Sequence, residues 1–202
     1  MPSARLREAL DAAVADVGPD EDIAILGHSI GGWVARAWVV DRGEQRVKRF
    51  VTLGTPHNEP PEGLFSNIAQ TRRHLKNDRA NCPPDPAVFT CVAGTATSTD
   101  TLGDVFKLDA WDDELRRSPL LEALVSLPSY LALAGKNPFG VKGDGLIPVA
   151  TACLADCPAI EVDCHHSDFV PTALDSIRLP ETYPWYGSPA VFGAWADALS
   201  IN

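Results

Sequence analysis

The feature that most constrains this sequence is a Gly-x-Ser-x-Gly motif at residues 27–31, with Ser29 at its centre. A short apolar run at 23–26 leads into the motif, and apolar residues at helical spacing follow it from 30 to 38. A strand, a tight turn and a helix in this order are typical of a nucleophile elbow, in which the serine side chain stands clear of the sheet edge. The small residues Gly27 and Gly31 are expected to let neighbouring backbone pass close to the turn.

Ser29 and Ile30 are expected to serve the same chemical step in different ways. A serine at such a turn presents its hydroxyl oxygen to a bound carbonyl group, as a nucleophile must. Ile30 begins the predicted helix, so its backbone N–H points toward the place where negative charge would develop on that carbonyl oxygen. The motif alone also fits a glycine-rich turn that only connects a strand to a helix. The hydrophobic patterns on both sides of the motif favour the elbow.

Composition limits the class of protein and its partners. Of the 202 residues, 45% are hydrophobic and 22% are charged, which is ordinary for one globular domain with a sizeable core. The formal net charge of −10 argues against nucleic acid or an anionic membrane surface as the main partner. No apolar run approaches the ~18 residues of a transmembrane span, and the amino-terminal residues do not resemble a signal peptide. Five cysteines without a regular spacing favour a reducing, intracellular compartment.

Strands and helices alternate along the predicted pattern. Strands are predicted at 23–26, 47–53, 88–93 and 159–163. Helices are predicted at 4–17, 30–41 and 66–75, and a longer helical stretch at 99–135 includes a helix at 120–127 that Ser118 caps. Ser3 and Ser188 are expected to cap the first and last helices. The last helix is expected to face the core with Val191, Phe192, Trp195 and Leu199. This alternation implies βαβ units and a parallel sheet.

A serine nucleophile needs a base, and the base needs a carboxylate that orients it. In folds with this elbow, the chain order is serine, then the acid, then histidine. Asp144 lies in a glycine-flanked loop between the third and fourth predicted strands, and His165 and His166 directly follow the fourth strand. Because catalytic loops gather at the carboxyl ends of parallel strands, Asp144 is the candidate acid and either histidine is a candidate base.

Other carboxylates and histidines fit the required order or position less well. A Gly-Asp-Gly sequence is common in surface turns, but the place of Asp144 between the last two strands favours it as the acid. His28 is the direct neighbour of the serine and is expected to pack or to face solvent rather than to act as the base. The residues set aside by order or position are Asp163, Asp168, His28, His57 and His74.

A second cluster of chemically active residues lies between 153 and 166. It contains the potential zinc ligands Cys153, Cys157, Cys164, His165 and His166. Structural zinc sites usually have closer Cys-x2-Cys pairs, and here two ligands would also be the candidate base and its neighbour. We therefore expect no metal site. A local disulfide between Cys153 and Cys157 stays open.

Taken together, these motifs resemble α/β-hydrolases of the lipase and esterase kind. The segment 27–37 is similar to their elbow, and the likeness is nearest to plant and algal proteins related to the GPI inositol-deacylase PGAP1. The resemblance covers most of the chain from Ile23 onward. Further similar segments are 53–57, 70–72, 90–95, 143–148 and 185–189.

The resemblance implies a serine hydrolase that cleaves carboxylic esters, with Ser29 as the nucleophile, Asp144 as the acid and His166 as the base. His166 is favoured over His165 because a serine follows the histidine in this family, as Ser167 does here. The implied substrate is a small acyl-ester or lipid molecule, no cofactor is expected, and a plastid location is compatible with the resemblance. The alternative is a hydrolase-fold protein that no longer catalyses and acts by binding.

The resemblance also implies an incomplete sheet. Related hydrolases have several strands ahead of the elbow, and a loop after one of them supplies a second oxyanion donor. Only 22 residues precede the first predicted strand here. We therefore expect one truncated α/β-hydrolase domain over 1–202, with about four core strands and lid-like inserts near 58–87 and 96–140. The run from Ile23 to Leu26 would then be an exposed edge that promotes self-association and accompanies weak activity.

Overall fold

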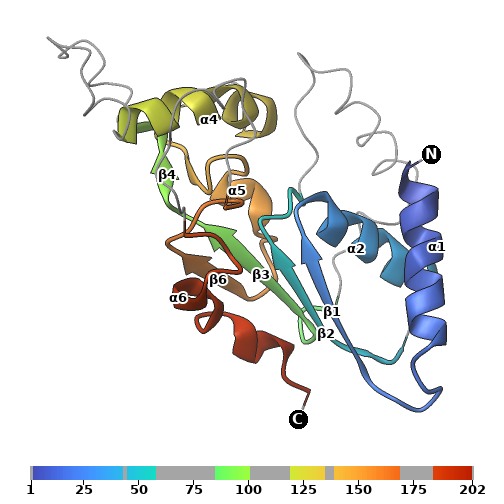
Figure 1. Ribbon diagram of the computed structural model, residues 1–202. Coiled ribbons are helices and arrows are strands. Elements are labelled where there is room, and N and C mark those ends of the chain that lie inside the picture. Colours follow the sequence, from blue (N-terminus) through green and yellow to red (C-terminus); the bar gives the residue numbers. More distant parts are fainter. Residues whose placement is uncertain are drawn as a thin grey trace, which may run out of the picture.

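A computed structural model describes residues 2–42, 45–57, 85–100, 119–134, 139–168 and 184–201. Within these ranges, four strands form one sheet in the order β1-β2-β3-β6 (Figure 1). The strands are β1 (Ile23–His28), β2 (Val47–Leu53), β3 (Phe89–Gly94) and β6 (Ala159–Val162). All three pairings are parallel, so the carboxyl ends of the strands meet at one edge of the sheet. The predicted α/β class with a parallel sheet is confirmed.

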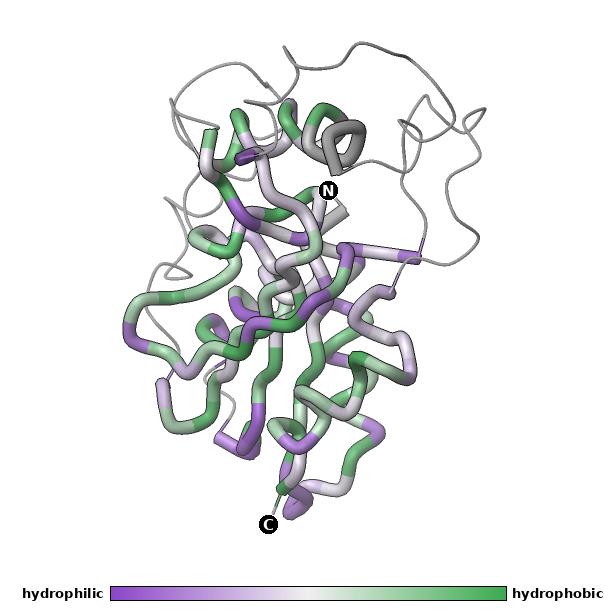
Figure 2. Tube along the Cα trace, turned by 90° about the vertical axis from the view of Figure 1, so that its left-hand side faces the viewer, coloured by the Kyte–Doolittle hydropathy of each residue, from purple (hydrophilic) through white to green (hydrophobic). Residues whose placement is uncertain are grey.

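Helices cover both faces of this sheet. The helices α1 (Pro2–Ala15) and α2 (Ile30–Arg42) lie on one face, and α6 (Pro189–Phe192) and the short 3-10 helix η4 (Ala196–Leu199) lie on the other (Figure 1). Successive strand residues point to opposite faces, so Phe50 packs toward the α1 and α2 side while Val51 packs toward Trp195. Figure 2 shows long hydrophobic stretches in the strands that run up the middle of the molecule. The core therefore consists of two apolar layers with the sheet between them.

A smaller unit lies beyond the carboxyl edge of the sheet. It contains α4 (Pro119–Ala134), α5 (Val149–Ala152) and a two-stranded antiparallel sheet of β4 (Thr97–Ser98) and β5 (Lys142–Gly143). The helix α4 packs on β4 and α5, and α5 packs on β3. Although α4 is strongly apolar, none of the helices in the described ranges is both long and apolar enough to cross a membrane. The two-residue strands were not predicted, because two residues are too few to show an alternating pattern.

Most predicted elements are present with small shifts at their ends. The strand at 47–53 is reproduced, and the other three strands differ from the prediction by at most two residues at either end. The helix predicted at 120–127 begins at Pro119, directly after Ser118 as its sequence indicates, and continues to Ala134. The helix predicted at 66–75 and residues 101–118 of the helical stretch predicted at 99–135 lie outside the described residues.

Three details of the predicted helices were wrong. The first helix begins at Pro2, so Ser3 is inside it rather than at its cap. The last predicted helix is divided into α6 and η4, because the chain leaves helical geometry at Trp195, whose indole N–H donates to the carbonyl of Tyr186 at 2.9 Å. This division turns Phe192 outward, where it is 49% exposed, whereas Trp195 is buried.

The hydroxyl of Ser188 also differs from the prediction. It makes no capping bond to α6 and instead accepts a hydrogen bond from the backbone N–H of Trp185 at 2.9 Å. The cap signature therefore locates the start of the short helix correctly but assigns the side chain the wrong partner. The proline at the first helical position, Pro189, agrees with the signature.

Within the described part of the chain, β1 has a neighbouring strand on one side only, which is β2. Leu26 on this strand is 48% exposed. An apolar strand with one unpaired side is a site where another strand can add. Self-association through this edge stays a prediction.

His57 is a core residue that the predicted chemistry does not use. Its side chain is 3% exposed, and its Nε2 lies 2.9 Å from the hydroxyl oxygen of Thr52. Burial and, secondarily, the positive charge of Arg36 lower the pKa of His57 to about 3. The folded protein therefore holds His57 in its neutral form over most of the acidic range.

The neutral state of His57 predicts a loss of stability in mild acid. The unfolded chain takes up a proton on this histidine below its ordinary pKa of 6.5, whereas the folded chain does so only near 3. Stability is therefore fully present above 6.5 and falls toward 3, by at most about 1.4 kcal/mol per pH unit from this one group. We expect urea unfolding between pH 7 and 4.5 to show a shallower fall for His57→Gln than for the wild type. Equal slopes would contradict the assignment.

Candidate functional site

The turn that carries Ser29 has strained backbone geometry. Ser29 has a φ of 54°, and it is the one non-glycine residue with left-handed backbone in the described ranges. Its N–H donates to the carbonyl of Leu53 on β2 at 2.9 Å, which anchors the turn to the neighbouring strand. Strain held in this way between a strand and a helix fixes the direction of a serine side chain.

The glycines around the turn do not all have the expected function. A Cβ on Gly27 would lie 2.2 Å from the Cα of Gly32, so Gly27 is required by close backbone approach, as predicted. A Cβ on Gly31 would meet nothing within 4 Å, so the prediction for Gly31 was wrong. Gly32 is the second crowded position, because a Cβ there would lie 2.2 Å from the hydroxyl oxygen of Thr55. The helix therefore meets β1 and the end of β2 through Gly32.

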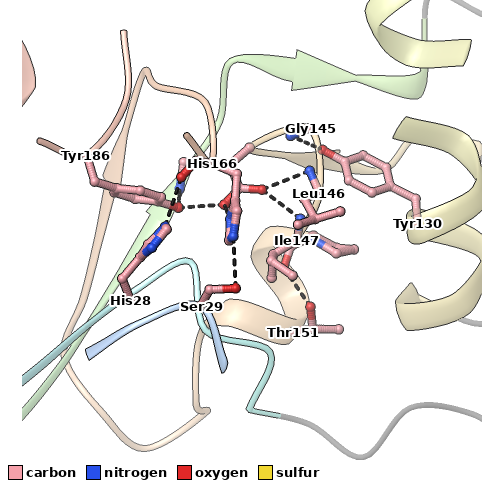
Figure 3. Close-up of polar contacts among 12 residues, drawn as sticks. His28, Ser29, Tyr130, Gly145, Leu146, Ile147, Thr151, His166 and Tyr186 are labelled. Carbon is pink, nitrogen blue, oxygen red and sulfur yellow. Dashed lines mark hydrogen bonds and ion pairs between the residues drawn. The ribbon is translucent and has the colours of Figure 1, made fainter. Parts of the chain in front are cut away.

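The structure brings Ser29, Asp144 and His166 together at the carboxyl edge of the sheet. Figure 3 shows the side chain of Ser29 directed at the ring of His166. The Nε2 atom of His166 lies 2.9 Å from Oγ of Ser29, and its Nδ1 atom lies 2.8 Å from Oδ2 of Asp144. The three residues follow β1, β5 and β6 respectively. A neutral imidazole here can donate its Nδ1–H to the carboxylate and accept the serine proton at Nε2.

The Asp144 carboxylate is almost completely buried, at 1% exposure. Its Oδ1 atom accepts the backbone N–H groups of Leu146 at 3.0 Å and Ile147 at 2.6 Å. Its Oδ2 atom accepts hydrogen bonds from His166 and from the hydroxyl of Tyr186, each at 2.8 Å. Four donors therefore satisfy both oxygens of a carboxylate that has almost no contact with water.

Two glycines at strand ends make room for this arrangement. Gly54 follows β2 with a φ of +52°, and a Cβ there would lie 2.5 Å from Oδ2 of Asp144 and 3.0 Å from Nδ1 of His166. Gly94 ends β3, and a Cβ there would lie 2.6 Å from Cβ of Asp144. The side chains of the site therefore occupy the space that larger residues at these strand ends would fill.

His28 contacts both the ring and the backbone of His166. Its Nε2 atom lies 2.9 Å from the backbone carbonyl oxygen of His166, and the two imidazole rings are 4.7 Å apart at their centres. Burial, and next the nearby His166, lower the pKa of His28. His28 does pack, as expected, but against the very histidine that contacts Ser29. A neutral ring here can accompany either protonation state of His166 without adding a second positive charge.

The other candidates are not in this cluster. The backbone of His165 donates to the carbonyl of Pro184 at 2.7 Å and forms an isolated bridge with Trp185, whereas the contacts to the serine and the acid belong to His166. Asp163 and Asp168 are exposed. His74 lies outside the described residues.

The cysteines near the site are free thiols. Cys153 and Cys157, the pair for which a disulfide stayed open, are both unpaired, as are Cys91 and Cys164. Burial raises the pKa of Cys91 to about 11 and that of Cys164 to about 12, which keeps both protonated at neutral pH. Among the described residues, no group of three or more potential ligands is arranged to hold a metal ion.

Sequence reasoning missed the residues that support the acid and the base. Tyr186 lies 42 positions after Asp144, and Tyr130 on α4 accepts the N–H of Gly145 in the acid loop at 3.0 Å. No spacing rule connects such distant positions. One feature of the sequence did point to Tyr186. It lies in the segment 185–189, which is part of the family resemblance but was given no function there.

Comparison with known proteins gives a family for the first part of the chain. A family profile described as "PGAP1-like alpha/beta domain" matches residues 9–85. By this match, residues 9–85 are similar to PGAP1-like α/β domains. The matched range contains the Gly-x-Ser-x-Gly turn with Ser29 and Ile30 and ends before Asp144 and His166. The resemblance found in the sequence is confirmed at this level.

A named relative supports the same family. The chain is 34% identical over 74 residues to a GPI inositol-deacylase of Chaetomium globosum (strain ATCC 6205 / CBS 148.51 / DSM 1962 / NBRC 6347 / NRRL 1970). The aligned part covers 34% of this chain and 6% of that protein's length. The PGAP1-like relationship thus concerns a small part of a much longer relative.

The packing around Gly54 predicts that a single methyl group there will disturb the site. Gly54→Ala places a side chain in left-handed backbone, which costs about 1–2 kcal/mol, and pushes it against Asp144 and His166. We expect a lower midpoint in urea unfolding. The matched control is Gly193→Ala, where φ is −62° and nothing lies within 4 Å of the new Cβ, so its stability should change little. Equal stability of the two variants would contradict the packing described above.

Proposed function

We propose that this PGAP1-like protein is a serine hydrolase that cleaves carboxylic esters. The observation that carries the proposal is the continuous chain of contacts from Ser29 Oγ through the His166 imidazole to the buried Asp144 carboxylate. The left-handed backbone at Ser29 supports it further, because an elbow of this kind exposes a nucleophile. The name of the Chaetomium relative, a deacylase, agrees with an enzyme that breaks acyl bonds.

In the proposed reaction, Ser29 attacks the ester carbonyl while His166 takes the serine proton at Nε2. The tetrahedral intermediate collapses, the alcohol leaves with the proton from His166, and an acyl group stays bound to Ser29. Water, activated by His166 in the same way, then releases the acid. Asp144 holds the Nδ1–H tautomer of His166 and stabilises the imidazolium that forms in each step.

Ile30 is the proposed donor to the oxyanion. It is the first residue of α2, and the first four N–H groups of a helix have no partner within the helix. Such N–H groups, at the positive end of the helix dipole, stabilise charge on an attacked carbonyl oxygen. Ile30 directly follows Ser29, so its N–H belongs to the same turn as the nucleophile.

An acyl group of lipid character is the proposed substrate portion. A groove of about 290 Å³ lies between α1, β1 and α2, and its lining includes Leu10, Ile25, Leu26 and Val34. The groove is also lined by Gly27, His28 and Gly31, which belong to the turn around Ser29, although Ser29 itself is not among the lining residues. An apolar groove that reaches this turn suits the hydrocarbon part of an ester.

A fluorophosphonate probe tests the nucleophile directly. We expect the wild-type chain to be labelled and Ser29→Ala to lose the label completely, because the probe reacts only with an activated serine. Asp144→Asn should remain folded but turn over p-nitrophenyl acyl esters about 10⁴-fold more slowly, by analogy with serine proteases, because His166 would then adopt the wrong tautomer.

The matched control is Ser200→Ala, which removes an exposed hydroxyl near the end of the described chain. It should be labelled at the wild-type rate. Failure of the folded wild-type chain to react with the probe would overturn the proposal and favour the alternative, a hydrolase fold that acts by binding.

A further inference from the structure

Tyr186 has contacts that packing alone does not require. Its ring is fully buried, at 0% exposure, behind the acid. Its hydroxyl donates to Oδ2 of Asp144 at 2.8 Å and accepts the backbone N–H of Gly94 at 2.7 Å. The hydroxyl is thus polarised by the end of β3 on one side and directed at the carboxylate on the other.

The two oxygens of Asp144 have different partners. Oδ1 is held within its own loop by the N–H groups of Leu146 and Ile147. Oδ2 is shared by His166 and Tyr186. Rotation of the carboxylate away from His166 would therefore break the Tyr186 bond as well as the loop bonds. Tyr186 is the one partner of Oδ2 besides the base among the contacts of the described residues.

Tyr186 also shares the negative charge. In the described part of the chain, the ion-pair partner of Asp144 is His166, which is charged only when protonated. When His166 is neutral, the buried carboxylate depends on neutral donors, and its two side-chain donors are the Nδ1–H of His166 and the hydroxyl of Tyr186.

We propose that Tyr186 is a positioning residue of the catalytic site, which fixes Oδ2 of Asp144 toward His166 and limits how strongly the Asp144–His166 pair holds a proton. This inference rests on the proposed hydrolase function. It extends the triad to a fourth side chain from the carboxyl-terminal part of the described chain. Removal of the hydroxyl should leave the pair with a higher affinity for protons and a less constrained geometry.

Tyr130 provides a matched comparison within the same site. Both tyrosines are 0% exposed, and both hydroxyls accept a backbone N–H, from Gly94 for Tyr186 and from Gly145 for Tyr130. Only the hydroxyl of Tyr186 donates to the Asp144 carboxylate. Tyr186→Phe and Tyr130→Phe therefore each remove one buried hydroxyl and free one backbone N–H, but differ in their effect on the acid.

The test compares these two variants in the full chain with p-nitrophenyl acyl esters across pH. For Tyr186→Phe we expect kcat to fall about 10- to 100-fold with little change in KM, as for the loss of a hydrogen bond to a charged group. The acidic limb of the kcat/KM profile should move up by about half a pH unit to one unit. Tyr130→Phe should leave this limb in place, even if it unfolds more easily. The other titratable neighbours, His28 and Cys164, are unchanged in both variants.

A fluorinated tyrosine gives the opposite change and keeps the hydroxyl. Because burial raises the pKa of Tyr186 well above 10, 3-fluorotyrosine at this position stays protonated and donates more strongly. It should move the acidic limb to lower pH. If Tyr186→Phe does not fold, this variant still tests whether Tyr186 is a positioning residue.

NMR titration of the His166 ring, assigned with His166→Asn, separates this inference from the proposed function. A midpoint that rises in Tyr186→Phe and falls with fluorotyrosine supports the positioning function, whether or not the chain turns over esters. An unchanged midpoint in both would overturn it. Wild-type inertness toward fluorophosphonate would overturn the hydrolase proposal alone.

Discussion

A carboxylate taken out of water must have its charge satisfied by donors, and Asp144 imposes this requirement on much of the structure. Its four donors come from its own loop, from the loop after β6 and from the segment before α6. A buried charge that loses a partner is strongly destabilising, so these separate parts of the chain are held to one arrangement. The glycines at the ends of β2 and β3 follow from the same requirement, because side chains there would occupy the space of the donors.

The parallel sheet supplies the positions from which these groups meet. Since all strands of the sheet run the same way, the turn after β1, the end of β2, the end of β3 and the loop after β6 come to one edge. The N–H of Ser29 bonds to the end of β2, and the N–H of His166 bonds to the carbonyl of Asp144 at 2.8 Å. Local backbone contacts thus bring together groups that are 137 residues apart in the chain.

The sequence predicted the parts of the site that depend on local patterns and chain order. Ser29 is marked by the glycine motif between a strand and a helix, and Asp144 and the pair His165 and His166 by their order relative to the strands. The family resemblance, and not chain order, favours His166 over His165. The supporting residues have no such marks. Tyr186 acts across 42 positions, and His28 reaches the carbonyl of His166 across 138. Their contacts depend on which strand ends meet, and hydrophobic periodicity does not contain that information.

The same difference between local patterns and tertiary contacts explains the errors in the predicted fold. The helix predicted from the pattern between 188 and 199 is periodic enough in sequence, but the buried bond from the Trp195 indole to Tyr186 outweighs helix propensity there. Gly31 ends the motif and Gly32 directly follows it, and only the packing of α2 against Thr55 shows that Gly32 is the crowded position. Tertiary contacts determine where the last helix divides and which glycine is crowded, and a local sequence pattern does not predict these contacts.

The most direct measurement of the central claim is a crystal structure of the chain after reaction with a phosphonate inhibitor. The account predicts phosphorus bonded to Oγ of Ser29, with a phosphonyl oxygen within hydrogen-bonding distance of the Ile30 N–H. It also predicts that Nδ1 of His166 still contacts Oδ2 of Asp144. A phosphonate attached to another residue, or one on Ser29 whose oxygens point away from α2 with the His166 contact broken, would contradict it.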